Sequence, residues 1–334
     1  MGSVARKCAP RRARFPLISR DNLDFSAIRV LDGAMATELE LRGCDLSGPL
    51  WSARVLEESP ETIAAVHLDF LRSGADCIET ASYQASTLGY RAVGLQGEVA
   101  AQAARRALQQ SVEIACAMRD AWAGESSRRA CVAASLGPYG AALHNGAEYH
   151  GQYAVSFDAL VGFHAERLAI AAETAADLVA METIPSLEEA VAILRALEKA
   201  PELPAWISFT CRDAKHVAHG EPLRACAEAV AGSPQVVAVG INCTAPGLAE
   251  ALIGEALRGA AWRKPVIVYP NSGETWDAVR RSWHGHSDPR DYGALAERWF
   301  AAGAQAVGGC CRTRPAHIAA VAAAAAKRQS GVVS

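Results

Sequence analysis

The feature that most constrains the fold is a repeated alternation of short apolar segments with longer helical patterns. The apolar segments are four to seven residues long and predict buried β-strands. They cover residues 29–33, 76–80, 131–135, 178–183, 205–210, 236–242, 265–269 and 306–309. Between them, apolar residues recur at three- and four-residue spacing, which predicts amphipathic helices. The clearest helical patterns span residues 61–73, 98–121, 157–176, 186–199 and 292–302.

This alternation predicts an α/β protein with a parallel sheet. The strands are continuously apolar, as expected when helices cover one face of the sheet and a packed interior covers the other. Eight is the number of strands that closes a (β/α)8 TIM-type barrel. An open doubly wound sheet is the alternative, but no Gly-x-Gly-x-x-Gly follows the first predicted strand. We therefore expect a single-domain barrel over residues 28–328.

The two ends of the chain differ from this pattern. Six basic residues fall within the first twenty positions, before any acidic one. We interpret residues 1–27 as a basic, disordered leader, with an organelle transit segment as the alternative. Residues 329–334 form a short tail. The helix at 186–199 is expected to begin with a capping box, because Glu189 follows Ser186 by three residues.

Composition excludes several classes of partner. The formal net charge is −3 and the pI is about 6.3, so no footprint for nucleic acid is expected. No apolar run approaches the roughly 20 residues that cross a bilayer. Without a signal peptide, the ten cysteines are expected to be reduced thiols in the cytoplasm. The predicted partners are small molecules, and the predicted state is a monomer or small homo-oligomer.

Several predicted strands end in polar residues. In a (β/α)8 barrel these ends meet at one mouth, where active sites lie. Candidate substrate-binding and catalytic residues at this mouth include Asp32, Gly33, Glu182, Asn242 and Asn271. Three cysteines also follow the ends of predicted strands.

Cys243, Cys310 and Cys311 follow the sixth and eighth predicted strands. Alternate strands contribute side chains to the same layer of a barrel, so the three thiols are expected to converge. Three thiolates at one point favour a soft cation, and zinc prefers sulfur-rich tetrahedral sites. With three protein ligands, a fourth position remains for a substrate. A substrate thiol there would bind as the thiolate, which favours attack on an alkyl group over hydrolysis.

Together these motifs resemble the homocysteine S-methyltransferase family, in the branch that uses S-methylmethionine. "DGAMATELE", "TASYQAS", "GPYGA", "ETIPS", "GINCT", "YPNSGE" and "GGCCRT" match its pattern in order over roughly residues 28–320. The resemblance implies a barrel with one zinc ion per chain that methylates the thiolate of homocysteine to give methionine. It implies that Cys243, Cys310 and Cys311 bind the zinc.

The resemblance also implies that Asp32 and Glu182 hold the amino group of homocysteine. A helix cap or an ion pair at the mouth is the alternative role of these two carboxylates. Asn242 would orient a ligand or make a turn bond. Tyr83 and Gln84 lie in a loop where this branch differs from its relatives.

Tyr83 and Tyr139 are candidates to face a sulfonium donor through cation–π attraction. Loop packing is the alternative for both rings. The glycine- and tyrosine-rich loop that contains Tyr139 is a candidate lid over the reacting methyl group. We do not expect the loop residues His144, His216 and His219 to be metal ligands.

Other functions remain open. A selenocysteine or other thiol methyltransferase would use the same soft site, and the donor is S-methylmethionine, S-adenosylmethionine or a betaine-type compound. A structural zinc or a redox thiol cluster is the non-enzymatic alternative. For a structural site, Cys211 is the one spare thiol near the mouth, whereas His317 is expected to point away.

Overall fold

The computed structural model describes residues 27–48, 50–126, 128–260, 264–277, 282–285 and 287–329. The predicted basic leader at 1–27 and the tail at 329–334 therefore lie almost wholly outside the described residues.

The centre of the molecule is a seven-stranded parallel sheet. Its strands follow the order β1-β2-β3-β4-β5-β6-β9, so neighbours along the chain are neighbours in the sheet. They are β1 Cys77–Glu79, β2 Cys131–Leu136, β3 Leu178–Ile184, β4 Ala205–Phe209, β5 Val236–Asn242, β6 Val266–Tyr269 and β9 Ala306–Val307. Each falls on one of the predicted apolar segments. The predicted α/β class with parallel strands is confirmed.

The first predicted strand, at 29–33, is the exception. Only Val30 and Leu31 pair, each through an isolated parallel bridge, Val30 to Val307 of β9 and Leu31 to Cys77 of β1. The segment thus lies between the two edge strands without forming a strand of its own among the described residues. The prediction of eight full strands is therefore wrong, because the sheet has seven strands and the segment at 29–33 forms only bridges. The backbone hydrogen bonds of this segment continue to Asp32, whose N donates to Cys77 O and whose O accepts from Gly309 N, and α1 begins at Met35.

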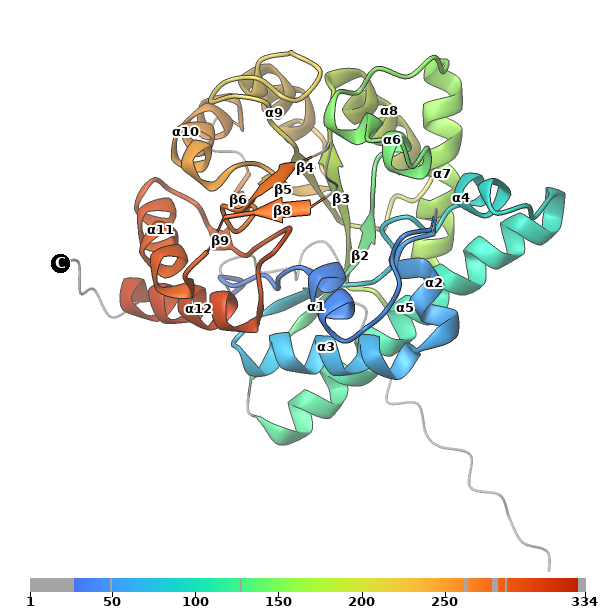
Figure 1. Ribbon diagram of the computed structural model, residues 1–334. Coiled ribbons are helices and arrows are strands. Elements are labelled where there is room, and N and C mark those ends of the chain that lie inside the picture. The colour runs from blue at the N-terminus through green and yellow to red at the C-terminus, as the bar shows by residue number, and fades with distance from the viewer. Residues whose placement is uncertain are drawn as a thin grey trace, which may run out of the picture.

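Helices surround the sheet, as Figure 1 shows in a view along the strands. They are α1 Met35–Leu41, α2 Ser52–Glu58, α3 Pro60–Arg72, α4 Thr87–Ala92, α5 Gly97–Glu125, α6 Tyr139–Ala142, α7 Phe157–Ala172, α8 Leu187–Leu197, α9 Leu223–Ala231, α10 Ala249–Ala260, α11 Pro289–Ala301 and α12 Pro315–Gln329. Two 3-10 turns, η2 Ala147–Tyr149 and η3 Pro246–Leu248, lie in loops. The five predicted helical patterns correspond to α3, α5, α7, α8 and α11.

The N-terminus of α8 differs from the expected capping box. Ser186 Oγ accepts a hydrogen bond from Glu189 N at 3.2 Å, as a cap should. The Glu189 carboxylate does not return to Ser186, because it accepts from Tyr139 N instead, at 2.6 Å. Only half of the box forms, and Glu189 belongs to a tertiary network that is described below.

The core has two layers. The larger one fills the space between the sheet and the helices and contains Ile63, Phe70, Met181, Ile193 and Trp299. A smaller one fills the inside of the curved sheet, with Leu31, Leu178, Trp206, Ile267 and Tyr269. This second cluster is a packed floor beneath the carboxyl ends of the strands, so a ligand can bind only above it.

Two further observations concern a hairpin after β6 and the length of the helices. An antiparallel hairpin, β7 Thr275–Asp277 with β8 Ser282–His284, follows β6 and was not predicted. In the view of Figure 1 β8 crosses in front of the central strands. No helix within the described ranges is long and apolar enough to cross a membrane.

Candidate active site

The three predicted thiols converge at one end of the sheet. Their Sγ atoms all lie within 4.8 Å of one another, and no other group of three or more potential metal ligands was found in the described part of the chain. Cys243 and Cys310 are joined as a disulfide with Cα atoms 5.5 Å apart. Cys311 Sγ lies 3.9 Å from Cys243 Sγ.

This arrangement fits a metal once the disulfide is reduced. Zn–S bonds of about 2.3 Å in a tetrahedron place two sulfurs about 3.8 Å apart. The observed 3.9 Å between Cys243 and Cys311 is close to that spacing. Burial raises the pKa of the Cys311 thiol to about 11, so this thiol is protonated at neutral pH unless a cation displaces the proton.

Local backbone geometry brings the three cysteines together. Cys243 follows β5 directly and has a φ of 47°. This is a left-handed backbone conformation that residues other than glycine seldom adopt. Gly309, just before Cys310, cannot carry a side chain, because a Cβ there would lie 2.4 Å from Thr313 Oγ1. Such strain and close approach are typical of positions that are held for a function.

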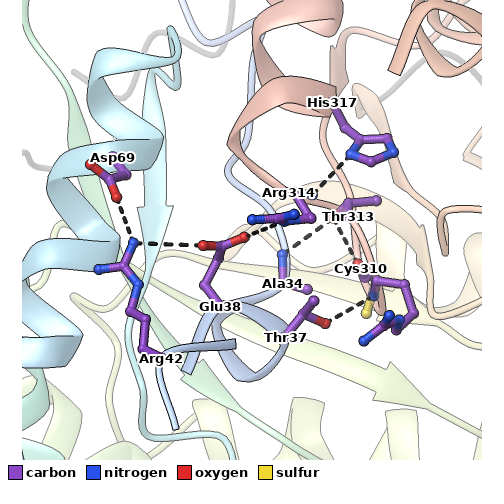
Figure 2. A network of polar contacts seen from close by, with 10 residues as sticks. Ala34, Thr37, Glu38, Arg42, Asp69, Cys310, Thr313, Arg314 and His317 are labelled. Carbon is purple, nitrogen blue, oxygen red and sulfur yellow. Dashed lines mark hydrogen bonds and ion pairs between the residues drawn. The ribbon is translucent and has the colours of Figure 1, made fainter. Parts of the chain in front are cut away.

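The loop that follows the cysteines is fastened to α1, as Figure 2 shows. Thr37 Oγ1 accepts from Arg312 N at 3.1 Å, and Ala34 N donates to Thr313 Oγ1 at 3.2 Å. The 95%-buried carboxylate of Glu38 accepts from Arg314 Nε at 2.9 Å. Glu38 also lies 3.6 Å from Arg42, which reaches Asp69 of α3. These contacts fasten the loop that follows Cys310 and Cys311 to α1, and through Arg42 to α3.

The two other candidate ligands point elsewhere. Cys211 is buried and lies outside the thiol cluster. His317 is engaged at both ring nitrogens, with Arg314 N at 3.1 Å and Ser287 Oγ at 3.1 Å. The prediction that His317 points away is confirmed. Within the described residues, the cluster consists of three thiols, and neither Cys211 nor His317 joins it.

Three carboxyl groups gather beside the thiols. Asp32 and Glu182 are buried, and Glu79 completes the group: its backbone N donates to Asp32 Oδ2 at 2.9 Å. Burial, followed by the charge of Glu182, raises the pKa of Glu79 well above its ordinary value. Burial also raises the pKa of Asp32 and of Glu182. Such a group attracts a cation, because a positive charge would let the carboxyls ionise.

The sequence does contain a signal for Glu79, because it ends a predicted strand as Asp32 and Glu182 do.

Asn242 serves the protein backbone. Its Oδ1 accepts from Thr183 N at 2.8 Å, and its Nδ2 donates to Thr183 Oγ1 at 2.9 Å and to Glu182 Oε2 at 3.4 Å. Thr183 has a φ of 61°, and the register of β3 with β4 shifts between Met181 and Ile184. A bulge of this kind redirects a side chain. Asn242 thus stabilises the distorted strand end that presents Glu182.

Comparison with known proteins agrees with this geometry. The sequence model described as homocysteine S-methyltransferase matches residues 29–325. This chain belongs to the homocysteine S-methyltransferase family. It is 46% identical to the homocysteine S-methyltransferase YbgG of Bacillus subtilis over 90% of this chain and 95% of that protein. It is 40% identical to a selenocysteine Se-methyltransferase of Brassica oleracea, over 87% of each chain.

A solved structure gives the same result. The metallated form of the homocysteine methyltransferase MmuM from Escherichia coli superimposes with a TM-score of 0.76 and 43% sequence identity. The match covers 89% of this chain and 96% of that one. The family resemblance drawn from the motifs is confirmed, and the protein is a methyltransferase.

Tyr83 and Tyr139, the two aromatic residues predicted to face the donor, lie in different surroundings. The Tyr83 ring packs edge-on against Trp51 with centroids 5.9 Å apart, and the charge of Glu182 adds to the burial that raises its pKa. Tyr139 instead packs against Tyr153 and Phe163, at 5.4 and 5.2 Å. A role for Tyr139 towards a donor stays a prediction, and its observed contacts are those of loop packing.

The other candidates each have one distinctive feature. Gln84 is buried and donates to Ala141 O at 3.1 Å, while its Oε1 has no hydrogen-bond partner. Asn271 Oδ1 is likewise buried without a partner. Gly33 is packed so closely that a Cβ would lie 2.8 Å from the Phe70 ring. The two free oxygens are available to a ligand.

Glu148 and Tyr149 of η2 are not among the residues predicted from the sequence. The buried Oε2 of Glu148 has no hydrogen-bond partner. Burial raises the pKa of Tyr83, and the negative charge of Glu148 raises it further. Tyr149 is 52% exposed. Both residues belong to an irregular loop next to β3, and no periodic pattern in the sequence marks them.

Proposed function

We propose that the protein transfers a methyl group from a sulfonium donor, S-methylmethionine or S-adenosylmethionine, to the thiolate of homocysteine, giving methionine. The observation that carries the proposal is the convergence of three thiols with Asp32, Glu79 and Glu182 above the packed floor. Thiol ligands suit a soft metal, and the carboxyls suit an ammonium group. Homocysteine carries both a thiol and an ammonium.

Cys243, Cys310 and Cys311 are the residues that would hold zinc. Bound there, zinc would keep a substrate thiol deprotonated at neutral pH and leave its sulfur electron-rich. The loop contacts from Thr37 and Glu38 keep Cys310 and Cys311 in place. The disulfide between Cys243 and Cys310 must be reduced first, because a disulfide sulfur has no anionic charge to offer.

Asp32 and Glu182 would bind the ammonium group of homocysteine, with Glu79 beside them. A buried carboxylate needs a charged partner, and the ammonium supplies one. The hydrogen bonds of Asn242 to Thr183 and Glu182 would keep the Glu182 carboxylate aimed at the ligand.

The donor would approach from the side of Tyr83. The face of an aromatic ring attracts a sulfonium cation, and Trp51 holds this ring edge-on. The thiolate sulfur attacks the methyl carbon, a new S–C bond forms, and the old one breaks with its electron pair on the donor sulfur. A neutral thioether leaves, so no acid is needed. Gly33, Gln84, Tyr139 and Asn271 are the remaining candidates to line the substrates.

We further propose that the curved sheet and the segment at Val30 and Leu31 together form a closed (β/α)8 barrel over residues 28–328. The support is the pair of bridges that place Val30 and Leu31 between β9 and β1. The basic leader at 1–27, the tail at 329–334 and a cytoplasmic location stay predictions, as does a monomer or small homo-oligomer.

Selenocysteine or another thiol remains the second candidate acceptor, and the 40% identity to a selenocysteine Se-methyltransferase is the observation that favours it. A betaine-type donor is the alternative donor. The thiol cluster as a redox pair is the non-enzymatic alternative, and the Cys243–Cys310 disulfide is its support.

A donor and acceptor panel tests these proposals. Reduced, zinc-loaded protein is mixed with homocysteine or selenocysteine and with S-methylmethionine, S-adenosylmethionine or betaine, and the products and bound metal are measured in the same preparation. We expect methionine from homocysteine with a sulfonium donor. Product from betaine alone, or no methyl transfer by zinc-loaded protein, would contradict the proposal.

A further inference from the structure

We infer that Glu148 binds the α-ammonium group of the methyl donor and thereby selects amino-acid donors over donors without that group. This inference rests on the proposed methyl transfer. It begins from Glu148 Oε2, which is buried and has no hydrogen-bond partner. A buried carboxylate oxygen without a partner is costly, so such an atom in a functional site points to a missing hydrogen-bond donor.

Position is the second observation. Glu148 belongs to η2, which packs against β3, the strand that carries Glu182. Its charge also acts on Tyr83, the ring assigned to the sulfonium donor. Glu148 therefore lies beside the strand that presents Glu182 and near enough to the predicted sulfonium-binding ring to influence its hydroxyl.

The donor's chemistry fits this position. S-methylmethionine and S-adenosylmethionine each carry a sulfonium and an α-ammonium, and only the ammonium has N–H groups to donate. Asp32 and Glu182 are assigned to the amino group of homocysteine, so the donor needs a carboxylate of its own. Gln84 Oε1, also buried and unpartnered, offers a second acceptor on the loop that carries Tyr83.

A buried network holds the Glu148 loop in shape. The loop runs from Tyr139 to Tyr153, and both ends reach Glu189: Tyr139 N donates to Oε1 at 2.6 Å, and the Tyr153 hydroxyl donates to Oε2. His164 Nε2 lies 2.9 Å from the same Oε1. Glu189 and His164 have fully buried side chains.

The network continues to the neighbouring loop. Arg167 lies 3.2 Å from His164 Nδ1 and donates to the carbonyls of Gly137 and Tyr83. Within the loop, Gly140 packs on the backbone of Glu148 so closely that a Cβ would lie 2.5 Å from Glu148 N. Glu148 and Tyr83 are thus positioned by one set of contacts, which preorganises them for a single ligand.

The experiment is equilibrium dialysis of the reduced, zinc-loaded full chain. Two sulfonium probes are used: S-methylmethionine, and dimethylsulfoniopropionate, which has the sulfonium but no α-amino group. Glu148→Gln keeps the shape of the side chain and removes its charge. We expect it to weaken S-methylmethionine binding by about 10- to 100-fold. We expect homocysteine and dimethylsulfoniopropionate binding to change by less than about 2-fold.

The matched control is Glu188→Gln, which removes one exposed carboxylate from α8 and should change none of the three affinities. Unchanged S-methylmethionine binding in Glu148→Gln would overturn the inference, and so would an equal loss for both sulfonium probes. A wild-type protein that binds neither probe would overturn it as well. Methionine formation by the wild type tests the proposed function separately, because it needs no variant.

Discussion

The side chain of Asn242 holds Thr183 at two points. Oδ1 accepts from the Thr183 backbone N at 2.8 Å, and Nδ2 donates to Thr183 Oγ1 at 2.9 Å. Thr183 has a φ of 61°, a conformation in which a β-branched residue is strained. The strain is tolerated because Asn242, which is fully buried, satisfies the polar groups that the bulge in β3 exposes. The result is a fixed direction for Glu182.

Asn242→Ala should therefore both destabilise the protein and damage the site. The change leaves Thr183 N–H buried and unpaired, and we expect a loss of about 2–3 kcal/mol in the free energy of unfolding. It should also raise the homocysteine KM more than the donor KM, since Glu182 loses its support. Urea unfolding and initial-rate kinetics on the same preparation measure both effects. An equal change in the two KM values would contradict the positioning role.

Substitution of a clustered cysteine should lower the metal content of the protein, whereas substitution of another cysteine should not. Cys311→Ala in reduced protein should lose stoichiometric zinc and methyl transfer, because two thiolates and solvent bind zinc more weakly than three. Cys211→Ala is the control: this thiol is buried but lies outside the cluster. Elemental analysis after dialysis reads out the result. Full zinc in Cys311→Ala, or its loss in Cys211→Ala, would refute the ligand assignment.

Much of this site was predictable because parallel strands end at one edge. Cys243, Cys310 and Cys311 each follow an apolar segment, and the fold brings them within 4.8 Å. What escaped prediction lies where local pattern and tertiary contacts disagree. Glu189 has the spacing of a helix cap, yet its carboxylate binds a loop from another part of the chain.

The remaining differences have similar causes. Glu148 lies in an irregular loop, where no period marks which side chains point inwards. Val30 and Leu31 are apolar enough for a strand, but each forms only an isolated bridge, one to β9 and the other to β1.

Metal affinity should rise with pH. The pKa of the Cys311 thiol is about 11, raised first by burial, so this group is protonated throughout pH 6.5–8.5. Each proton that the metal displaces from such a thiol increases the apparent affinity about tenfold per pH unit. Competition with a chelator of known protonation behaviour, in reduced protein, measures the slope. A zinc affinity independent of pH over this range would show that Cys311 does not lose a proton to the metal.

Glu189 should make a distinctive contribution to stability as pH changes. Burial raises its pKa to about 8, far above the roughly 4.3 of an unfolded chain. Between these values the folded state binds more protons than the unfolded state, so this group's contribution is complete at low pH and falls as pH rises towards 8. The slope from one such group reaches about 1.4 kcal/mol per pH unit.

Glu189→Gln removes the titration, so its destabilisation relative to wild type should be greatest near pH 5 and should shrink by pH 8. Urea unfolding of both proteins across this range checks the sign, with Glu188→Gln as the exposed control. A difference that stays constant with pH would mean that Glu189 keeps the same protonation state in the folded and unfolded chains.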